Sequence, residues 1–201
     1  MNTKIFSVMF SGLCLLALTV SAAAQQQPKV VKPETITTPA KLVITKLKIG
    51  ESDTYEVRGK ATYTVTAANS DDSIAGTLVY TIPDDARQKV AQITGKPLTD
   101  IPATITTKDV VASFQKATAC PVVHLEFTPM DISIAGVKDH FNRFVLDVNE
   151  TLPGATKGQQ EIATLFCVWT KQINAGRARR GVIARMNVIL NGEQEQDATE
   201  K

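Results

Sequence analysis

The sequence predicts a mostly-β domain, an antiparallel β barrel or sandwich with one or two short helices. Three observations indicate this class. Apolar and polar residues alternate with a period of two, the apolar segments are rich in β-branched residues, and turn-forming residues separate them. The 201 residues are 43% hydrophobic and 21% charged, which is typical of one globular domain with a sizeable core. The 11 glycines and 9 prolines are too few for a collagen-like or wholly disordered chain.

The first 24 residues have the features of a secretory signal peptide. Lys4 precedes an apolar run, residues 5–20, and three alanines at 22–24 precede Gln25. We therefore expect cleavage before Gln25 and export to the periplasm or the exterior of a bacterial cell. The apolar run is shorter than a membrane-spanning helix requires, and no later segment is long enough, so no transmembrane span is expected.

The two ends of the remaining chain differ in composition from its middle. Residues 25–40 are polar and contain prolines, which predicts a flexible N-terminal tether. Residues 193–201 carry four acidic side chains and one lysine without large apolar residues, which predicts a disordered acidic tail. The β-rich domain is accordingly expected to span residues 41–192.

The predicted strands follow the alternating pattern along the chain. The segment 56–67 is the clearest, because every second residue from Val57 to Ala67 is apolar or glycine and the residues between are threonine, lysine or arginine. Further strands are expected at residues 42–49, 76–82, 122–128, 131–135 and 143–149. A long β-hairpin is expected from residues 162–173 and 179–190, because Asn174 and Gly176 between them suit a turn.

Short helices are expected at two places between the strands. Asp84 and Asp85 follow a proline and precede apolar residues at helical spacing, so a helix is expected to begin there and to end at Gly95. Residues 109–117 suit a second short helix and a strand equally well. Val110, Phe114 and Ala117 align at helical spacing, whereas the β-branched Val110 and Val111 favour a strand.

The cysteines indicate a disulfide bond. Cleavage of the signal peptide removes Cys14 and leaves Cys120 and Cys167. An even number of cysteines in an exported protein predicts that they pair, and the alternative is two buried free thiols. Trp169 lies in the same apolar segment as Cys167, where a single tryptophan is expected to belong to the core rather than to a ligand site.

Motifs typical of enzyme active sites, nucleotide-binding loops and zinc clusters are absent from the sequence. We therefore expect a protein that is not an enzyme and needs no cofactor. His124 and Glu126 are weak candidates for metal ligands, because they share one face of a predicted strand. A zinc site needs at least three protein ligands, and the spacing brings no third one, so a polar outward face is the alternative.

The most distinctive charge pattern lies in residues 171–185, which include five basic and no acidic side chains in a chain with a formal net charge of +2. The five are Lys171, Arg177, Arg179, Arg180 and Arg185. Arginine binds phosphate, sulfate and carboxylate groups, so this hairpin tip is a candidate site for an anionic lipid or polysaccharide surface, or for an envelope protein. The alternative is a solvated turn. The low net charge argues against nucleic-acid binding.

Residues 114–148 contain a short helix, a Cys-Pro step, the strand VVHLEFT, a second strand and the strand RFVLDV. This order resembles the exported polyprenoid-binding family with a lipocalin-like barrel. The resemblance carries no ligand-binding residue, and it implies a carrier of a small apolar ligand such as an isoprenoid or a fatty acid. The residues themselves favour an exported, non-catalytic β-domain that binds a partner or an anionic surface at the cell envelope.

Overall fold

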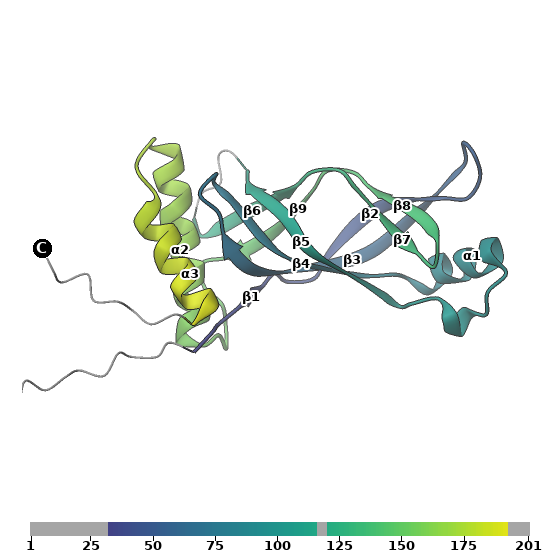
Figure 1. Cartoon of the computed structure of the whole chain (residues 1–201), viewed down its shortest axis with the longest axis horizontal. Coiled ribbons are helices and arrows are strands. Elements are labelled where there is room, and N and C mark those ends of the chain that lie inside the picture. The colour runs from purple at the N-terminus through teal and green to yellow at the C-terminus, as the bar shows by residue number, and fades with distance from the viewer. Residues whose placement is uncertain (1–31, 116–119, 193–201) are drawn as a thin grey trace, which may run out of the picture.

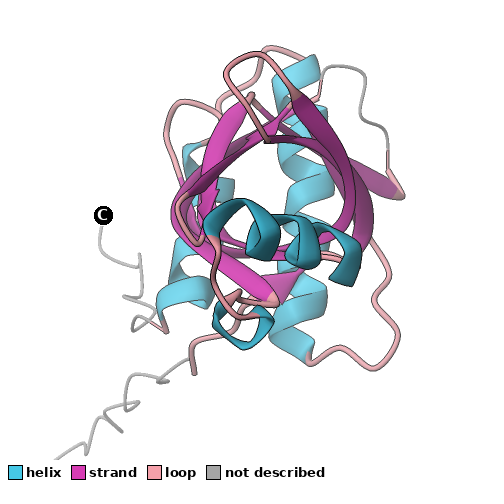
Figure 2. Ribbon diagram, turned by 90° about the vertical axis from the view of Figure 1, so that its right-hand side faces the viewer, coloured by secondary structure: helices cyan, strands magenta, loops and turns pink. Residues whose placement is uncertain are grey.

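The structure is a computed structural model, and it describes residues 32–115 and 120–192. Within these residues an antiparallel sheet curls into a half-barrel, and three helices lie at its ends (Figure 1). Figure 2, which looks along the sheet from the end where α1 lies, shows the strands curving round one another. The predicted mostly-β class is therefore confirmed, and the sheet curls as in a barrel rather than packing against a second sheet as in a sandwich.

The sheet contains nine strands in the order β7-β8-β2-β3-β4-β5-β6-β9, with β1 paired to β3, and all of these pairs are antiparallel. A 3-10 turn, Leu98–Asp100, follows α1. The strands are β1 Ile36–Thr37, β2 Lys41–Lys48, β3 Thr54–Ala68, β4 Ser73–Thr81, β5 Thr104–Phe114, β6 Val122–Phe127, β7 Met130–Ile134, β8 Val137–Phe141 and β9 Phe144–Asn149. The helices are α1 Asp84–Thr94, α2 Lys157–Asn174 and α3 Arg180–Asn191.

The strands β6 to β9 form one long hairpin that pairs with both edges of the sheet β2-β3-β4-β5. β6 continues through a two-residue step into β7, and β8 continues through a similar step into β9. β6 pairs with β5, whereas β8 pairs with β2, so the same hairpin bonds to both edges of the sheet β2-β3-β4-β5. β2 and β9 are not neighbours in the strand order, but an ion pair links them: Lys41 Nζ on β2 lies 2.8 Å from Asp147 Oδ2 on β9. These connections curl the sheet.

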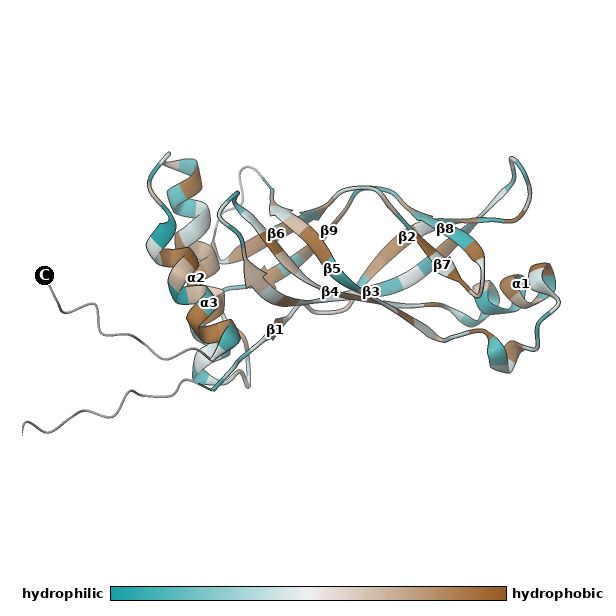
Figure 3. Cartoon of the chain, viewed as in Figure 1, coloured by the Kyte–Doolittle hydropathy of each residue, from teal (hydrophilic) through white to brown (hydrophobic). Residues whose placement is uncertain are grey.

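The inner face of the sheet is packed with side chains. Buried residues alternate with more exposed ones along β2, β3 and β6, as a half-buried strand requires, and Figure 3 shows both hydrophobic and hydrophilic stretches in the sheet. Tyr63 is fully buried and packs edge-on against Phe127, with ring centroids 4.9 Å apart, and Phe127 stacks on Phe144 at 4.6 Å. A Cβ on Gly76 would collide with the carbonyl oxygen of Thr64 and with the Tyr63 ring. Glycine at position 76 is therefore required by the close approach of β3 and β4.

The prediction of a long β-hairpin at residues 162–173 and 179–190 is wrong, because these segments form the helices α2 and α3. Thr156 begins α2 with a capping box: its hydroxyl accepts from the Gln159 backbone amide at 3.1 Å, and the Gln159 side chain accepts from the Thr156 amide at 3.1 Å. The buried residues of α2 recur every three or four positions, and they are Ile162, Ala163, Phe166, Cys167, Trp169 and Thr170. The continuous apolar run at residues 165–169 hides this helical period.

The two short-helix predictions have different outcomes. The helix predicted from Asp84 to Gly95 is confirmed as α1, which ends at Gly95 in the left-handed conformation with φ 66°. At residues 109–117 the strand alternative holds for the part that β5 covers, whose last residue is Phe114. Residues 116 and 117 lie outside the described residues.

The helical hairpin of α2 and α3 covers one end of the half-barrel, and α1 lies at the other end (Figure 1). Asn187 on α3 binds the end of β3 with both atoms of its amide: its Oδ1 accepts from the Ala68 amide at 2.8 Å, and its Nδ2 donates to the Ala68 carbonyl at 2.9 Å. The described part of the predicted tether also joins this end, because Ile36 is 2% exposed and Glu34 N donates to Ile189 O at 3.0 Å. The ordered fold therefore includes residues before Lys41.

Candidate anion-binding site

The candidate basic residues lie at the turn between α2 and α3, residues 175–179, and on the helices beside it. The prediction placed them at the tip of a β-hairpin, and this location is corrected to a helix–helix connection. Gly176 has φ 62°, and the amide of Arg177 donates to Gln172 O at 2.9 Å, which closes the turn. Lys171 lies in the last turn of α2, and Arg180 is the first residue of α3. The turn thus gathers charges that are spread over 15 residues of sequence.

Two of the five basic side chains are held in ion pairs. Arg179 Nε lies 2.6 Å from Asp72 Oδ1, and Arg185 Nε lies 2.7 Å from Glu161 Oε1. The first pair connects the α2–α3 turn to the loop between β3 and β4, and the second connects α3 to α2. Arg179 Nη1 also donates to the Arg177 carbonyl at 3.1 Å. Arg179 and Arg185 therefore hold the turn in place.

Arg177 and Arg180 are exposed, and among the described residues neither forms an ion pair. Together with Arg179 they line a hollow of about 430 Å³, which we call the arginine hollow and which Ser70 and Ile183 also border. The backbone amides at the start of α3 carry a partial positive charge. The first turn of α3 contains no acidic residue that would offset this charge. Lys171 is exposed on α2 and does not line the hollow.

Asp72 holds two groups of this region at once. The same carboxylate oxygen that pairs with Arg179 accepts from Trp169 Nε1 at 3.2 Å. Trp169 is fully buried and packs against Phe114 with ring centroids 4.8 Å apart, so its prediction as a core residue is confirmed. The Asp72 carboxylate is therefore already engaged by Arg179 and Trp169.

His124 and Glu126 share the outward face of β6. Each of the two side chains contacts a charged residue of another segment, and they do not pair with each other. His124 Nδ1 lies 2.7 Å from Asp147 Oδ1, and Glu126 Oε1 lies 3.1 Å from an amino nitrogen of Arg143. Within the described residues, no cluster of three metal-ligating groups includes either of them. Partial burial raises the pKa of Asp147, but hydrogen bonds from Lys41 and His124 outweigh this effect and lower it. His124 and Glu126 thus each have a charged partner on the outward face of the sheet.

A second histidine–aspartate pair on the same hairpin was not predicted from the sequence. His140 Nδ1 on β8 lies 2.7 Å from Asp131 Oδ1 on β7, and Lys138 Nζ lies 2.7 Å from the other oxygen of Asp131. These hydrogen bonds, that of Lys138 first, lower the pKa of Asp131. His140 also borders a hollow of about 330 Å³ with Lys46 and Lys48, in which Glu51 and Asp53 supply opposite charges.

Asp139, between Lys138 and His140, points to the opposite face of β8 and is fully buried. Thr45 Oγ1 on β2 donates to Asp139 Oδ2 at 2.9 Å and lies 3.1 Å from the hydroxyl of Tyr80 on β4. Burial raises the pKa of Asp139 to about 6 and that of Tyr80 to about 12. The sequence pattern does not reveal this group, because a charged residue at a core position breaks the apolar alternation that marks a strand.

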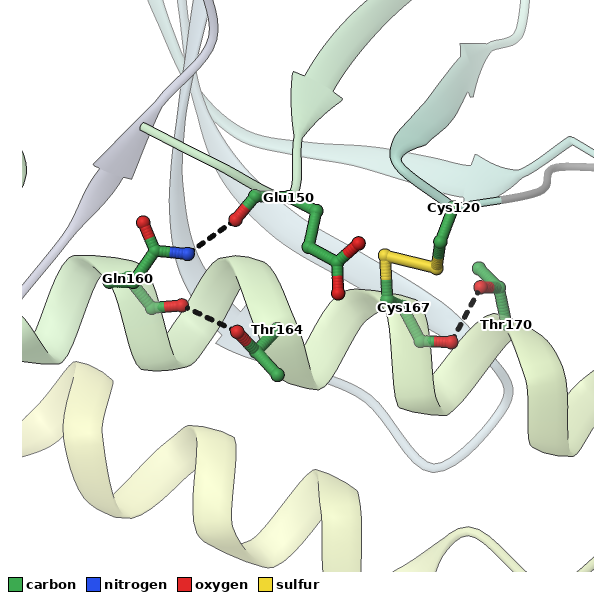
Figure 4. Close-up of a disulfide and its surroundings, with 6 residues drawn as sticks. All are labelled: Cys120, Glu150, Gln160, Thr164, Cys167 and Thr170. Atoms are coloured by element: carbon green, nitrogen blue, oxygen red, sulfur yellow. Dashed lines mark hydrogen bonds between the residues drawn. A yellow bond between two sulfur atoms is a disulfide. The ribbon is translucent and has the colours of Figure 1, made fainter. Parts of the chain in front are cut away.

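The predicted disulfide between Cys120 and Cys167 is confirmed (Figure 4). It joins the residue before cis-Pro121, at the start of β6, to the middle of α2, with the two Cα atoms 5.6 Å apart. Glu150, which follows β9, lies beside the two sulfur atoms. The disulfide therefore fastens the helical hairpin to the sheet.

Comparisons with known proteins found no matching family model, no matching curated protein and no matching solved structure. The resemblance of residues 114–148 to the polyprenoid-binding family thus receives no support from them. Within the described residues, each helix is too short or too polar to cross a membrane.

Proposed function

We propose that the chain is an exported, non-catalytic β-domain that binds an anionic surface at the cell envelope through the α2–α3 turn. The arginine hollow is the observation that carries this proposal. Arg177 and Arg180 present two guanidinium groups to solvent at its wall, without a carboxylate partner among the described residues. Guanidinium groups form paired hydrogen bonds with phosphate, sulfate and carboxylate, so a headgroup or an anionic sugar is the kind of ligand that fits.

The rigidity of the turn supports a binding role over that of a solvated loop. The Arg179–Asp72 ion pair and the disulfide at Cys167 fix the turn and α2 to the sheet. A ligand that binds to a fixed backbone does not have to order it, so less free energy is lost on binding. Arg177 and Arg180 are thus presented on a preformed support.

Export is supported by the composition of the first 24 residues and by the disulfide. Disulfides persist in oxidising compartments and are rare in the reducing cytosol. A site for an anionic surface fits such a location, because envelope lipids and polysaccharides carry phosphate and carboxylate groups.

The alternative function, a lipocalin-like carrier of an apolar ligand, has less support from the packing of the sheet. A carrier needs an interior space for its ligand. Here large side chains meet inside the curled sheet: Tyr63 contacts Phe127, and Tyr80 contacts Phe141 with ring centroids 4.8 Å apart. All four of these rings are fully buried.

Co-sedimentation with lipid vesicles tests the proposed function. We expect the chain from residue 25 onward to bind vesicles that contain an anionic phospholipid and not vesicles of a zwitterionic lipid alone. Binding should weaken as salt is added, because ions screen charges over about 10 Å at 0.1 M. A parallel column of an anionic polysaccharide distinguishes a lipid from a sugar surface. If neither matrix retains the protein at low salt, the proposal is wrong.

A further inference from the structure

The carboxylate of Glu150 lies beside the disulfide between Cys120 and Cys167. The sulfur atoms of Cys120 and Cys167 and a carboxylate oxygen of Glu150 all lie within 4.8 Å of one another. Figure 4 shows the Glu150 side chain directed toward the two sulfurs. Cys167 is buried, whereas Cys120 and Glu150 are half-buried, so the cluster lies at the edge of the core.

Backbone contacts hold Glu150 in this place. Its amide donates to the Pro121 carbonyl at 2.6 Å, next to Cys120, and its own carbonyl accepts from the side-chain amide of Gln160 on α2. Val122, the first residue of β6, pairs with Asn149, the last residue of β9, so Pro121 before β6 and Glu150 after β9 lie next to each other. The three residues therefore come from three segments that the fold fixes at one point.

The carboxylate itself has neither a hydrogen bond nor an ion pair among the described residues. A disulfide offers a carboxylate no hydrogen-bond donor, and it has no positive charge. Two thiolates would repel the carboxylate even more strongly, unless a cation lay between the three groups. Once the bond between the sulfurs is broken, Cys120, Cys167 and Glu150 would therefore offer a cation three ligand atoms at one point.

We propose that Cys120, Cys167 and Glu150 form a binding site for a thiolate-seeking divalent metal ion of the zinc class when the disulfide is reduced. Two thiolates and one carboxylate are three ligands of the types that Zn²⁺ takes, and a water would fill the fourth tetrahedral position. At Zn–S distances of about 2.3 Å the two sulfurs would stand roughly 3.8 Å apart, so metal binding requires that the bond between them is broken first.

The chemistry balances with a dithiol as the reductant. The dithiol transfers two electrons and two protons to the disulfide, which becomes two thiols, while the dithiol becomes a disulfide. Binding of the metal ion then releases the two thiol protons, because cysteine binds metals as the thiolate. Since both states use the same sulfur atoms, metal binding and the disulfide exclude each other.

Metal titration of the reduced and the oxidised chain tests this proposal. A phosphine serves as reductant in the test, because it does not compete for the metal as a dithiol does; it takes its oxygen from water and leaves two protons on the sulfurs. We expect the reduced chain, freed of phosphine, to bind one Zn²⁺ in equilibrium dialysis. With Co²⁺ it should show a thiolate-to-metal charge-transfer band. The oxidised chain should show neither.

Glu150→Gln tests the third ligand, with Glu51→Gln as a control at an exposed carboxylate on a distant turn. Glu150→Gln should weaken Zn²⁺ binding by the reduced chain at least tenfold, and Glu51→Gln should leave it unchanged. Glu150→Gln can still form the disulfide, so its folding is checked in the oxidised state by circular dichroism.

Two results would overturn the proposal. The first is a reduced chain that binds no Zn²⁺ at micromolar concentration, whether the fluorescence of the buried Trp169 reports it as folded or unfolded. The second is equal affinity of the wild type and Glu150→Gln, which would leave Glu150 without a role.

Discussion

Arg179 and Asp72 are joined by an ion pair of 2.6 Å that spans more than a hundred residues of sequence. The pair fixes the α2–α3 turn to the loop between β3 and β4, and the same oxygen of Asp72 accepts from Trp169. The charge of Arg179 is thus used to hold the turn, while the guanidinium groups of Arg177 and Arg180 stay open to solvent. We therefore expect the position of the α2–α3 turn, and with it the arginine hollow, to depend on Asp72.

Asp72→Asn should lower the free energy of unfolding by about 0.5 to 1 kcal/mol, because the substitution removes the charge of a partly exposed pair. Asparagine tolerates the backbone at position 72, whose φ is 65°, and it keeps an oxygen for Trp169. Urea denaturation measures the change. Asp53→Asn, on an exposed turn, is the control, and equal stability of the two variants would show that the pair contributes nothing.

Cys167→Ser should lower the free energy of unfolding by about 4 kcal/mol, because the disulfide closes a segment of 47 residues. Denaturation of oxidised and reduced wild type gives the comparison, and the reduced wild type should approach the variant. If all three unfold at the same denaturant concentration, the bond does not stabilise the fold.

Asp139 should make the protein less stable as the pH rises. Its pKa is about 6 in the folded chain against an ordinary 3.8, so the folded state binds more protons between these values. Stability from this group is complete below pH 3.8 and is lost as the pH rises through 6, by about 3 kcal/mol in total. Asp139→Asn should be more stable than the wild type at pH 7.

The difference in unfolding free energy between wild type and Asp139→Asn should therefore shrink from pH 7 to pH 4. Asp131 and Asp147 have lowered pKa values, so their stabilising contributions are lost as the pH falls. Both proteins share these contributions, which therefore cancel in the difference. A difference that is constant with pH would show that Asp139 does not titrate in this range.

Ile36→Ala should lower the free energy of unfolding by about 2 to 4 kcal/mol, because Ile36 is 2% exposed and its removal leaves a cavity. Thr37→Ala is the control on the adjacent, exposed position of the same short strand and should change stability by less than about 1 kcal/mol. Thermal unfolding measures both. Equal small effects would mean that β1 is dispensable, as a tether would be.

The period-two pattern predicts most of the sheet, because a strand with one buried face leaves this mark in the sequence. Six of the eight predicted strands overlap an observed one, namely β2, β3, β4, β6, β7 or β9, and the two of the expected hairpin are helices instead. β8 escaped prediction, since it is five residues long and its central residue is the buried Asp139. α2 was mistaken for a strand, because apolar residues at 165–169 occupy more than one face of the helix.

The candidate site was only partly predictable for a different reason. Charge clustering along the sequence identifies Arg177 and Arg180, since they lie close together in the chain. Which arginines are already paired depends on Asp72 and Glu161, and no local pattern reveals such distant partners. The place of Glu150 beside the disulfide also arises from the tertiary fold alone.

The central claim is that Arg177 and Arg180 bind an anionic surface, and the dissociation constant for anionic vesicles at low salt tests it most directly. Arg177→Gln/Arg180→Gln should raise this constant about 30-fold, since each charge near such a surface contributes about 1 kcal/mol. Lys60→Gln/Lys108→Gln removes the same charge from exposed positions on β3 and β5 and should change the constant far less. Equal losses in the two variants would show that only net charge matters and would contradict the assignment of the site.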